Sequence, residues 1–412
     1  ERTGAIAAAA TTSLPEWIGG ERNWDYRYSW IRDSVFAVRA LHQLGFTREA
    51  DRFACFIQRS AGGDAEQLQT LFCIDGHRRS TEVELAHLSG YRGSRPVRIG
   101  NAAATQLQLD AYGELLELAW LRYQHGRDIA ADWDFLADIV DVAARRWREP
   151  DYGIWEVRNE PQHFVFSKAL CWVALQRGIQ LAESCGLKAP LAQWRQNRDA
   201  IRHEIQTEGY DAKLGCFRQA YGNSKADASL LLLPWFHFVP YDDPRMLRTT
   251  EHIAAELDQG GLIRRYDAED GLRGPEGVFL PCTFWLVDCL ARQGRTDDAR
   301  RYYDRASACA NDLGIHSEEF DVDANAMLGN FAQGLTHESQ IIARLALRNE
   351  PWRDETRGMR AAVKARTLQR EDDGNQSTNE SEAGGESREA MHEERQHDDA
   401  VRAQTMAMER KR

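Results

Sequence analysis

Apolar residues recur at helical spacing through most of the chain, and the segments that carry this pattern come in pairs. Glycine, proline and N-capping residues separate the segments. Alternating strand patterns are almost absent, so the expected class is all-α. The predicted helices lie at about 30–44 and 47–60, 101–125 and 130–147, 163–185 and 190–208, 226–235 and 244–259, 277–293 and 296–313, and 330–348 and 352–368.

The two helices of a pair differ in polarity. Residues 230–233 and 278–290, in first helices, are apolar on nearly every side, whereas 297–308, in a second helix, has a charged face. A helix that is apolar all round is buried, and a striped helix lies outside. We therefore predict an (α/α)6 barrel of six helical hairpins, with six inner helices surrounded by six outer ones.

The connections that lead into the inner helices carry many aromatic and charged residues. If the hairpins alternate in direction, all of these connections lie at one end of the barrel. The opposite connections, at 45–46, 186–187 and 293–294, are short and plain. Loops at one end of a rigid scaffold commonly carry function, so we predict one cleft there. The loops that would form it are 24–33, 91–101, 155–163, 217–227, 264–276 and 316–337.

Composition divides the chain into three parts. Residues 1–22 are small, polar and interrupted by proline and glycine, and they read as an extended lead-in. Residues 23–368 hold the barrel. Residues 369–412 form a charged tail that should be disordered, because 371–412 contain no Leu, Ile, Phe, Tyr or Trp and cannot bury enough apolar surface.

Charge and cysteine usage exclude several classes of protein. The chain of 412 residues has a net charge of -12, so a nucleic-acid-binding face is not expected. No apolar run is long enough for a membrane span, and the N-terminus lacks the features of a signal peptide. The 8 cysteines form no Cys-x-x-Cys pair, which fits reduced thiols in a cytoplasmic protein. The 12 histidines show no metal-binding spacing, so we predict neither a metal nor a cofactor.

The first candidate for chemistry is Glu156, which directly follows Trp155 in a loop that Pro150 and Gly153 interrupt. A carboxyl group beside an indole in a pocket is poorly solvated, and poor solvation disfavours its charged form. Such a group could protonate a leaving oxygen. Taken alone, the spacing fits better a tryptophan that anchors a loop beside an exposed glutamate.

The other loops of the predicted cleft strengthen the chemical interpretation. Loop 24–33 places four aromatic residues next to Arg32 and Asp33, although Asp33 could also be only an acid in the first turn of a helix. Aromatic rings stack on sugar rings, and an Arg–Asp pair binds hydroxyl groups. Loop 316–337 carries Glu318, which could face Glu156 across the cleft. Two facing carboxylates among aromatic residues are the arrangement of glycoside hydrolysis.

A basic strip at 91–98 could bind an anion, but we favour the interpretation that it neutralises the acidic cleft. No glycine-rich phosphate loop, Ser-His-Asp order or nucleotide fingerprint competes with these motifs.

Several long segments together resemble glycoside hydrolase family 15, the glucoamylase and bacterial trehalase group. The resemblance spans about residues 3–350. The segments that carry it are Thr11-Thr12-Ser13-Leu14-Pro15-Glu16, residues 23–33, residues 90–101, Gly153-Ile154-Trp155-Glu156-Val157-Arg158, and Ser317-Glu318-Glu319 followed by Gly329-Asn330-Phe331.

The resemblance implies an (α/α)6 barrel and an inverting, exo-acting α-glucosidase that releases β-glucose from trehalose or from α-glucan ends. Glu156 matches the general acid and Glu318 the general base, with the two carboxyl groups about 6.5–9.5 Å apart. Tyr26 looks like the residue that supports the base and its water. The residues expected to bind the carbohydrate are Tyr26, Trp30, Arg32, Asp33, Arg95, Trp155, Arg265, Tyr266 and Glu319.

Two alternatives remain open at this point. Bacterial members of the family carry a β-sandwich domain before the barrel, and this chain begins almost where the barrel does. A catalytically impaired sugar-binding fragment is therefore one alternative, and exposed barrel surface would be a reason to form an oligomer. A glycoside phosphorylase on the same barrel is the other, although the presence of Glu318 speaks against it. Reduced thiols and the lack of an export signal favour trehalose over starch.

Overall fold

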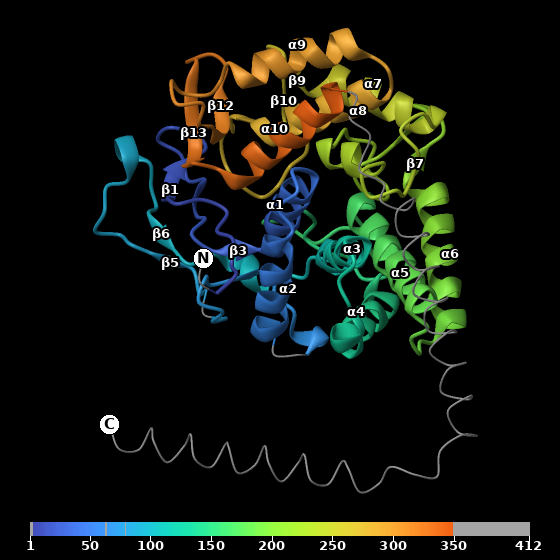
Figure 1. Ribbon diagram of the computed structural model, residues 1–412. Coiled ribbons are helices and arrows are strands. Elements are labelled where there is room, and N and C mark those ends of the chain that lie inside the picture. The colour runs from blue at the N-terminus through green and yellow to red at the C-terminus, as the bar shows by residue number, and fades with distance from the viewer. Residues whose placement is uncertain (1–2, 62–63, 79, 349–412) are drawn as a thin grey trace, which may run out of the picture. The chain divides into compact units, whose positions relative to one another are not determined.

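The structure is a computed structural model that describes residues 3–61, 64–78 and 80–348 (Figure 1). The predicted helix at 352–368 and the predicted tail at 369–412 lie outside these residues. The α-helices of the described part are α1 (Ile31–Gln43), α2 (Arg48–Ala61), α3 (Asp110–Gln124), α4 (Trp133–Arg146), α5 (Val165–Cys185), α6 (Leu191–Glu208), α7 (Pro244–Leu257), α8 (Leu280–Arg292), α9 (Thr296–Ser307) and α10 (Gly334–Leu347).

The inner helices close into a ring. Helix α1 packs against both α3 and α10, α3 packs against α5, and α8 packs against α10. The short 3-10 helix η5 (Ala228–Leu232) fills the place between α5 and α8. Helices α2, α4, α6, α7 and α9 pack on the outside of their hairpin partners (Figure 1). The predicted class, an all-α barrel of helical hairpins, is confirmed.

The inner element of the fourth hairpin is shorter than predicted. The pattern at 226–235 predicts an α-helix, but only the five residues of η5 are regularly helical. Asp227 caps η5, since its side chain accepts a hydrogen bond from the N–H of Ser229. Leu233, which follows η5, still has an α conformation, but Pro234 lacks the N–H that would donate the next hydrogen bond of the element.

The second hairpin also begins later than predicted. Asn101 does cap a helix, but this is the 3-10 helix η3 (Ala102–Thr105), and α3 starts only at Asp110. Between the two, the backbone of Leu107 bonds to the segment that carries Glu156. The break therefore allows the loop before α3 to contact the loop that carries Glu156, at the end of the barrel where the cleft is predicted.

Short antiparallel strands, which the sequence pattern did not reveal, form within the connections. The largest sheet has the order β11-β12-β13 and lies at the functional end of the barrel. The strands are β1 (Thr12–Pro15), β2 (Asn23–Asp25), β3 (Ser29–Trp30), β4 (Leu71–Phe72), β5 (Val83–Glu84), β6 (Arg98–Ile99), β7 (Tyr210–Asp211), β8 (Cys216–Phe217), β9 (Asp258–Gln259), β10 (Leu262–Ile263), β11 (Val278–Phe279), β12 (Ser317–Asp321) and β13 (Ala326–Phe331). Strand β13 occupies the predicted start of the last inner helix, which moves to Gly334.

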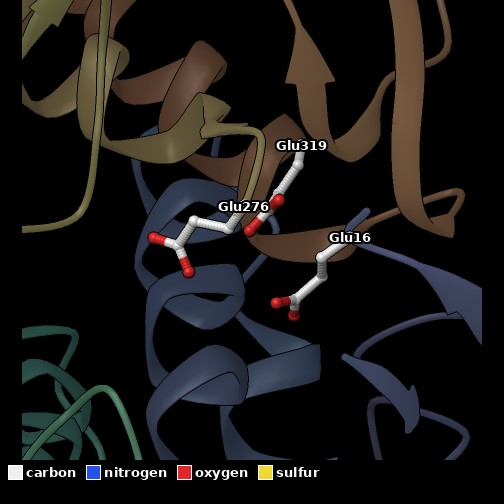
Figure 2. Close-up of side chains that lie close together, drawn as sticks. All are labelled: Glu16, Glu276 and Glu319. Carbon is white, nitrogen blue, oxygen red and sulfur yellow. The ribbon is translucent and has the colours of Figure 1, made fainter. Parts of the chain in front are cut away.

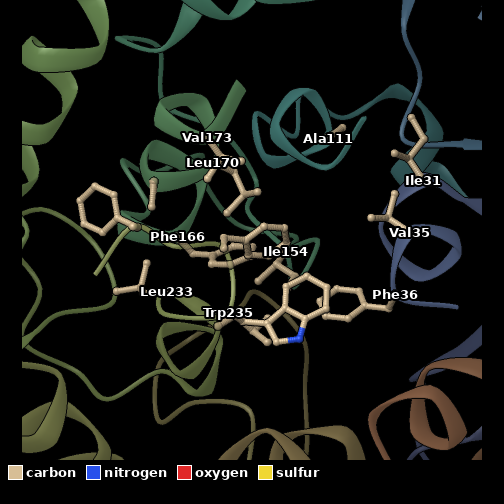
Figure 3. Packing of buried hydrophobic residues seen from close by; sticks show 14 of the residues in the cluster. Ile31, Val35, Phe36, Ala111, Ile154, Phe166, Leu170, Val173, Leu233 and Trp235 are labelled. Atoms are coloured by element: carbon tan, nitrogen blue, oxygen red, sulfur yellow. The ribbon is translucent and has the colours of Figure 1, made fainter. Parts of the chain in front are cut away.

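An aromatic core fills the ring beneath the functional end. The ring of Phe36 on α1 stacks on Trp235 with centroids 4.6 Å apart, and Trp285 on α8 lies 6.0 Å away. Ile154, from the Glu156 loop, reaches into the same cluster (Figure 3). Stacked rings in a close-packed core form a rigid base beneath the loops that enter the inner helices.

Two further features bear on the expectations from composition. All eight cysteines are free, and five of them are buried. None of the helices in the described part of the chain has the length and apolarity that crossing a membrane requires.

Candidate active site

Glu156 stands in a tight turn between α4 and α5. The N–H of Glu156 donates to the carbonyl of Gly153 at 3.2 Å, and the N–H of Val157 donates to the carbonyl of Tyr152 at 3.3 Å. Glu156 has a φ of 57°, a left-handed conformation that is uncommon for a residue with a side chain. Residues held in this region often mark functional sites, because the surroundings must compensate for the strain.

Gly153 is required for this turn. Its φ is 66°, and a Cβ atom there would lie 2.7 Å from the ring of Phe164. Any other residue would therefore both strain the backbone and push the ring at the start of α5.

The indole that contacts Glu156 belongs to Trp30 rather than to its neighbour Trp155. The Nε1–H of Trp30 donates to Glu156 Oε1 at 2.7 Å, and Nη1 of Arg32 lies 3.5 Å from the same oxygen. Trp155 instead donates its Nε1–H to the carboxylate of Asp227 at 2.9 Å. The Trp155–Glu156 dipeptide thus points its two side chains at different partners, and Trp30 and Arg32 fix the carboxyl group of Glu156.

The backbone of the turn is held from behind by Gln106. The side-chain amide of Gln106 donates to the carbonyl of Val157 at 3.1 Å and to that of Glu156 at 3.4 Å. Gln108 in turn donates to Oε1 of Gln106 at 3.3 Å. Both glutamines lie in the break between η3 and α3, so the break places their amides beside the turn that carries Glu156.

Glu318 lies in β12, at an irregularity in its pairing with β13. Such bulges redirect side chains and are common beside active sites. One oxygen of Glu318 accepts a hydrogen bond from the N–H of Asn330 at 3.3 Å. Its other oxygen is buried and has no hydrogen-bond partner among the described residues. Gly329 makes room for this arrangement, because a Cβ there would lie 2.6 Å from the Glu318 carboxylate.

The charges of both carboxyl groups act on Tyr26. Burial raises the pKa of Tyr26 well above its usual value, and the charges of Glu318, Glu16 and Glu156 raise it further, while Arg265 acts in the opposite direction. The Tyr26 hydroxyl therefore responds to the charge of both Glu156 and Glu318, although these residues are 162 positions apart in sequence. Its ring also packs edge-on against Trp30, with centroids 5.2 Å apart.

A cluster of buried carboxyl groups adjoins Glu318 (Figure 2). Glu16, Glu276 and Glu319 bring one oxygen each within 4.8 Å of one another, a grouping that could hold a cation. The guanidinium of Arg265 already occupies the position of such a cation. It lies 3.2 Å from Glu16, 3.2 Å from Glu319 and also in contact with Glu276. Within the described residues, the guanidinium of Arg265 thus supplies the positive charge that balances these three carboxylates.

Burial raises the pKa of Glu318 to about 8, with the charge of Glu16 as the next cause. Arg265, the hydroxyl of Tyr26 and the N–H of Asn330 act in the opposite direction. Burial likewise raises the pKa of Glu16 and that of Glu319. Burial and like charges packed into one cluster thus both favour the protonated form of these groups.

A small pocket of about 30 Å³ opens between these elements. Five residues predicted from sequence line it, namely Tyr26, Trp155, Glu156, Arg265 and Tyr266. This volume accepts a few water molecules at most, and ligand sites are about ten times larger. A sugar ring therefore enters only if lining side chains move. Trp24 and Leu272 are part of the lining that would have to move, and the guanidinium groups of Arg98 and Arg158 each lie 4.7 Å from the Trp24 ring.

The remaining predicted residues occupy other positions. Trp30, Arg32 and Asp33 lie behind Glu156 and support it, and Arg32 pairs with Asp33 at 2.8 Å. Glu319 is fully enclosed beside Arg265. Arg95 is exposed, donates to the carbonyl of Ser89 at 3.5 Å, and does not line the pocket.

Sequence reasoning missed several residues of the site. Glu16 is the main one, because it lies in the segment expected to be only a lead-in, yet it is 1% exposed and lines the pocket. The segment Thr11–Glu16 was a recognisable motif, and this signal could have identified it. Arg22, which pairs with Asp270 at 2.7 Å, and Gln106 gave no such signal.

Comparison with known proteins places the chain among carbohydrate-active enzymes. Residues 1–345 match the family model described as glycosyl hydrolases family 15. The chain is 47% identical over 348 residues to a trehalase of Mycobacterium tuberculosis and, over the same length, 47% identical to one of Mycolicibacterium smegmatis. These alignments cover 83% of this chain but only 51% and 52% of the two relatives. The chain thus spans about half the length of the curated relatives it matches.

The fold has its own counterpart among solved structures. A bacterial glucoamylase complexed with acarbose superposes with a TM-score of 0.66 at 16% sequence identity, over 85% of this chain and 53% of that one. At this identity the likeness concerns the fold alone.

Proposed function

Because the chain belongs to glycosyl hydrolases family 15, we propose that it hydrolyses α-glucosides, with trehalose as the first candidate substrate. Glu156 acts as general acid and Glu318 as general base. The observation that carries the proposal is that Tyr26 lines one pocket with Glu156, while the charge of Glu318 acts on the same Tyr26 hydroxyl and raises its pKa. The preference for trehalose rests on the two relatives named trehalase.

The reaction is a single displacement. Glu318 accepts a proton from water as the water oxygen forms a bond to the anomeric carbon of the glucosyl unit. The glycosidic bond breaks at the same time, and Glu156 gives its proton to the departing oxygen. Both carboxyl groups are held for these roles, Glu156 by Trp30 and Glu318 by the N–H of Asn330. The oxygen of Glu318 that does not accept from Asn330 is the one available to a water molecule.

The test is release of glucose from trehalose, maltose and maltoheptaose by the purified chain, followed by proton NMR at early times. Inversion of trehalose gives one β-glucose from the attacked ring and one α-glucose from the leaving ring, whereas retention gives α-glucose only. From the two malto-oligosaccharides, inversion releases β-glucose. A folded chain that releases no glucose from any of the three would contradict the proposal. Glucose 1-phosphate formed only with added phosphate would instead identify a phosphorylase.

Glu16 is expected to set the lower end of the pH range. A base must be deprotonated, so kcat/KM should rise as pH rises through the pKa of Glu318. The charge of Glu16 raises that pKa, and Glu16→Gln removes this charge and frees Arg265 to interact with Glu318. The acid limb of the kcat/KM profile should therefore move to lower pH in Glu16→Gln.

The matched control is Glu256→Gln, an exposed glutamate on α7, which should leave the profile unchanged. An acid limb that stays in place or moves to higher pH in Glu16→Gln would show that Glu16 does not act on the base.

A further inference from the structure

A second, larger cavity lies outside the candidate active site. Its volume is about 370 Å³, and it is bounded by the segments 66–70 and 104–108 together with the ends of α3 and α4. It shares no lining residue with the pocket that Glu156 and Tyr26 line. The volume falls within the range of sites for small molecules, and it would hold one or two sugar-sized rings.

The lining is rich in groups that bind hydroxyls. Gln69, Gln106 and Gln108 contribute amides, and Thr105 and Tyr112 contribute hydroxyl groups. Oε1 of Gln69 is buried and has no hydrogen-bond partner among the described residues. A buried polar atom without a partner is unfavourable, so a ligand hydroxyl that donates to it would bind favourably.

The charged groups of the lining already have partners. Arg146 donates to Glu149 at 2.9 Å, and Glu66 pairs with Arg145. Arg78 donates to the backbone carbonyls of Ser60 and Ala61. Gln106, Thr105 and Tyr112 also have partners, so the unpartnered buried polar atom of the lining among the described residues is Oε1 of Gln69. An amide oxygen accepts from a hydroxyl and repels an anion, so the lining suits a neutral ligand better than an anion.

The cavity also touches the support of the catalytic turn. Gln106 lines the cavity, and the same side-chain amide holds the carbonyls of Glu156 and Val157. From these observations we propose that the cavity is a second binding site, for a neutral polyhydroxylated ring. A ligand there contacts Gln106 and stabilises the turn that carries Glu156. Binding at this site does not require the hydrolytic activity.

The proposal can be tested by calorimetric titration with myo-inositol, a neutral ring polyol that has no anomeric carbon. The wild-type chain should bind it, and Gln69→Leu should weaken binding about tenfold, as expected when one hydrogen bond to a buried acceptor is lost. Thr105→Val, a milder change on the exposed rim, should weaken binding in the same direction. Gln193→Leu, on the exposed face of α6, is the matched control and should bind as the wild type does.

A second measurement follows the catalytic turn directly. Hydrogen exchange of a peptide covering 152–158 should slow when myo-inositol binds the wild-type chain, and should not change in Gln69→Leu. Glu318→Gln should bind myo-inositol normally, which separates this site from the active site even if the chain hydrolyses nothing.

Three outcomes would overturn the proposal. The first is that the folded wild-type chain gives no binding heat, and the second is that Gln69→Leu and Thr105→Val, shown to be folded by circular dichroism, bind with unchanged affinity. The third is that sodium sulfate displaces myo-inositol, because this would assign the cavity to anions.

Discussion

Replacing Glu156 with glutamine is expected to lower kcat on trehalose by a factor of about 10²–10⁴, the usual contribution of a positioned general acid. Glutamine keeps the size of the side chain, and its amide oxygen can still accept the hydrogen bond from Trp30. It cannot give a proton to the leaving oxygen. Glu318→Gln should lower kcat to a similar extent, because the attacking water then loses its base. Initial rates of glucose release, measured on folded protein, give both values.

The two roles can be distinguished with α-glucosyl fluoride. Fluoride departs without a full proton transfer, so Glu156→Gln should regain much of its rate on this substrate. Glu318→Gln should remain impaired, because attack by water is still needed. If Glu318→Gln were the variant that recovers, the acid and the base would have to be exchanged. Full activity of either variant on trehalose would remove that residue from the mechanism.

The hairpins and both carboxyl groups could be predicted because their signals are local. The apolar pattern of 278–290 shows a buried helix without reference to any other part of the chain, and α8 is buried as predicted. The Trp155–Glu156 dipeptide and the Ser317–Glu319 segment belong to recognisable motifs. The sequence could not show that Trp30, rather than Trp155, would contact Glu156, because this depends on how two separate loops meet.

The missed features all depend on contacts between distant segments. Glu16 acts through Arg265, which lies 249 positions away. The role of Gln106 depends on its hydrogen bonds to the backbone carbonyls of Glu156 and Val157, which lie about 50 positions away in sequence. Periodicity favoured a continuous helix at 101–125, and tertiary hydrogen bonds overrode this local preference. Arg95 differs from these residues, since a motif places it in the predicted site and its side chain is exposed outside the pocket.

Arg265→Leu is expected to reduce the free energy of unfolding by about 3–5 kcal/mol, the usual effect of removing one partner from a buried ion pair. Arg265 is the shared counter-ion of Glu16, Glu276 and Glu319, and its side chain is 9% exposed. Without it, these carboxyl groups stay buried and lose a charge that lowers the pKa of Glu16 and of Glu319. Urea unfolding followed by circular dichroism measures the loss.

The loss should depend on pH in a defined direction. Burial already holds the pKa of Glu16 and of Glu319 above the ordinary value of 4.5 that they have in the unfolded chain, and removal of Arg265 raises both further. A group whose pKa is higher in the folded chain favours folding when protonated, so its contribution is present below pH 4.5 and is lost as pH rises. The difference between Arg265→Leu and the wild type should therefore be smaller at pH 5 than at pH 8.

A second substitution and a surface control make this prediction specific. Adding Glu16→Gln to Arg265→Leu should restore part of the stability, because one uncompensated buried charge is removed. Arg195→Leu, which breaks the half-exposed pair with Glu183 on α6 and α5, should lower the free energy of unfolding by less than about 1 kcal/mol at any pH. If Arg265→Leu proved as mild as this control, or were more destabilising at pH 5 than at pH 8, the cluster would not rely on Arg265. In that case the carboxyl groups of Glu16, Glu276 and Glu319 would have to be kept neutral by one another, and Arg265 would be free to serve the substrate alone.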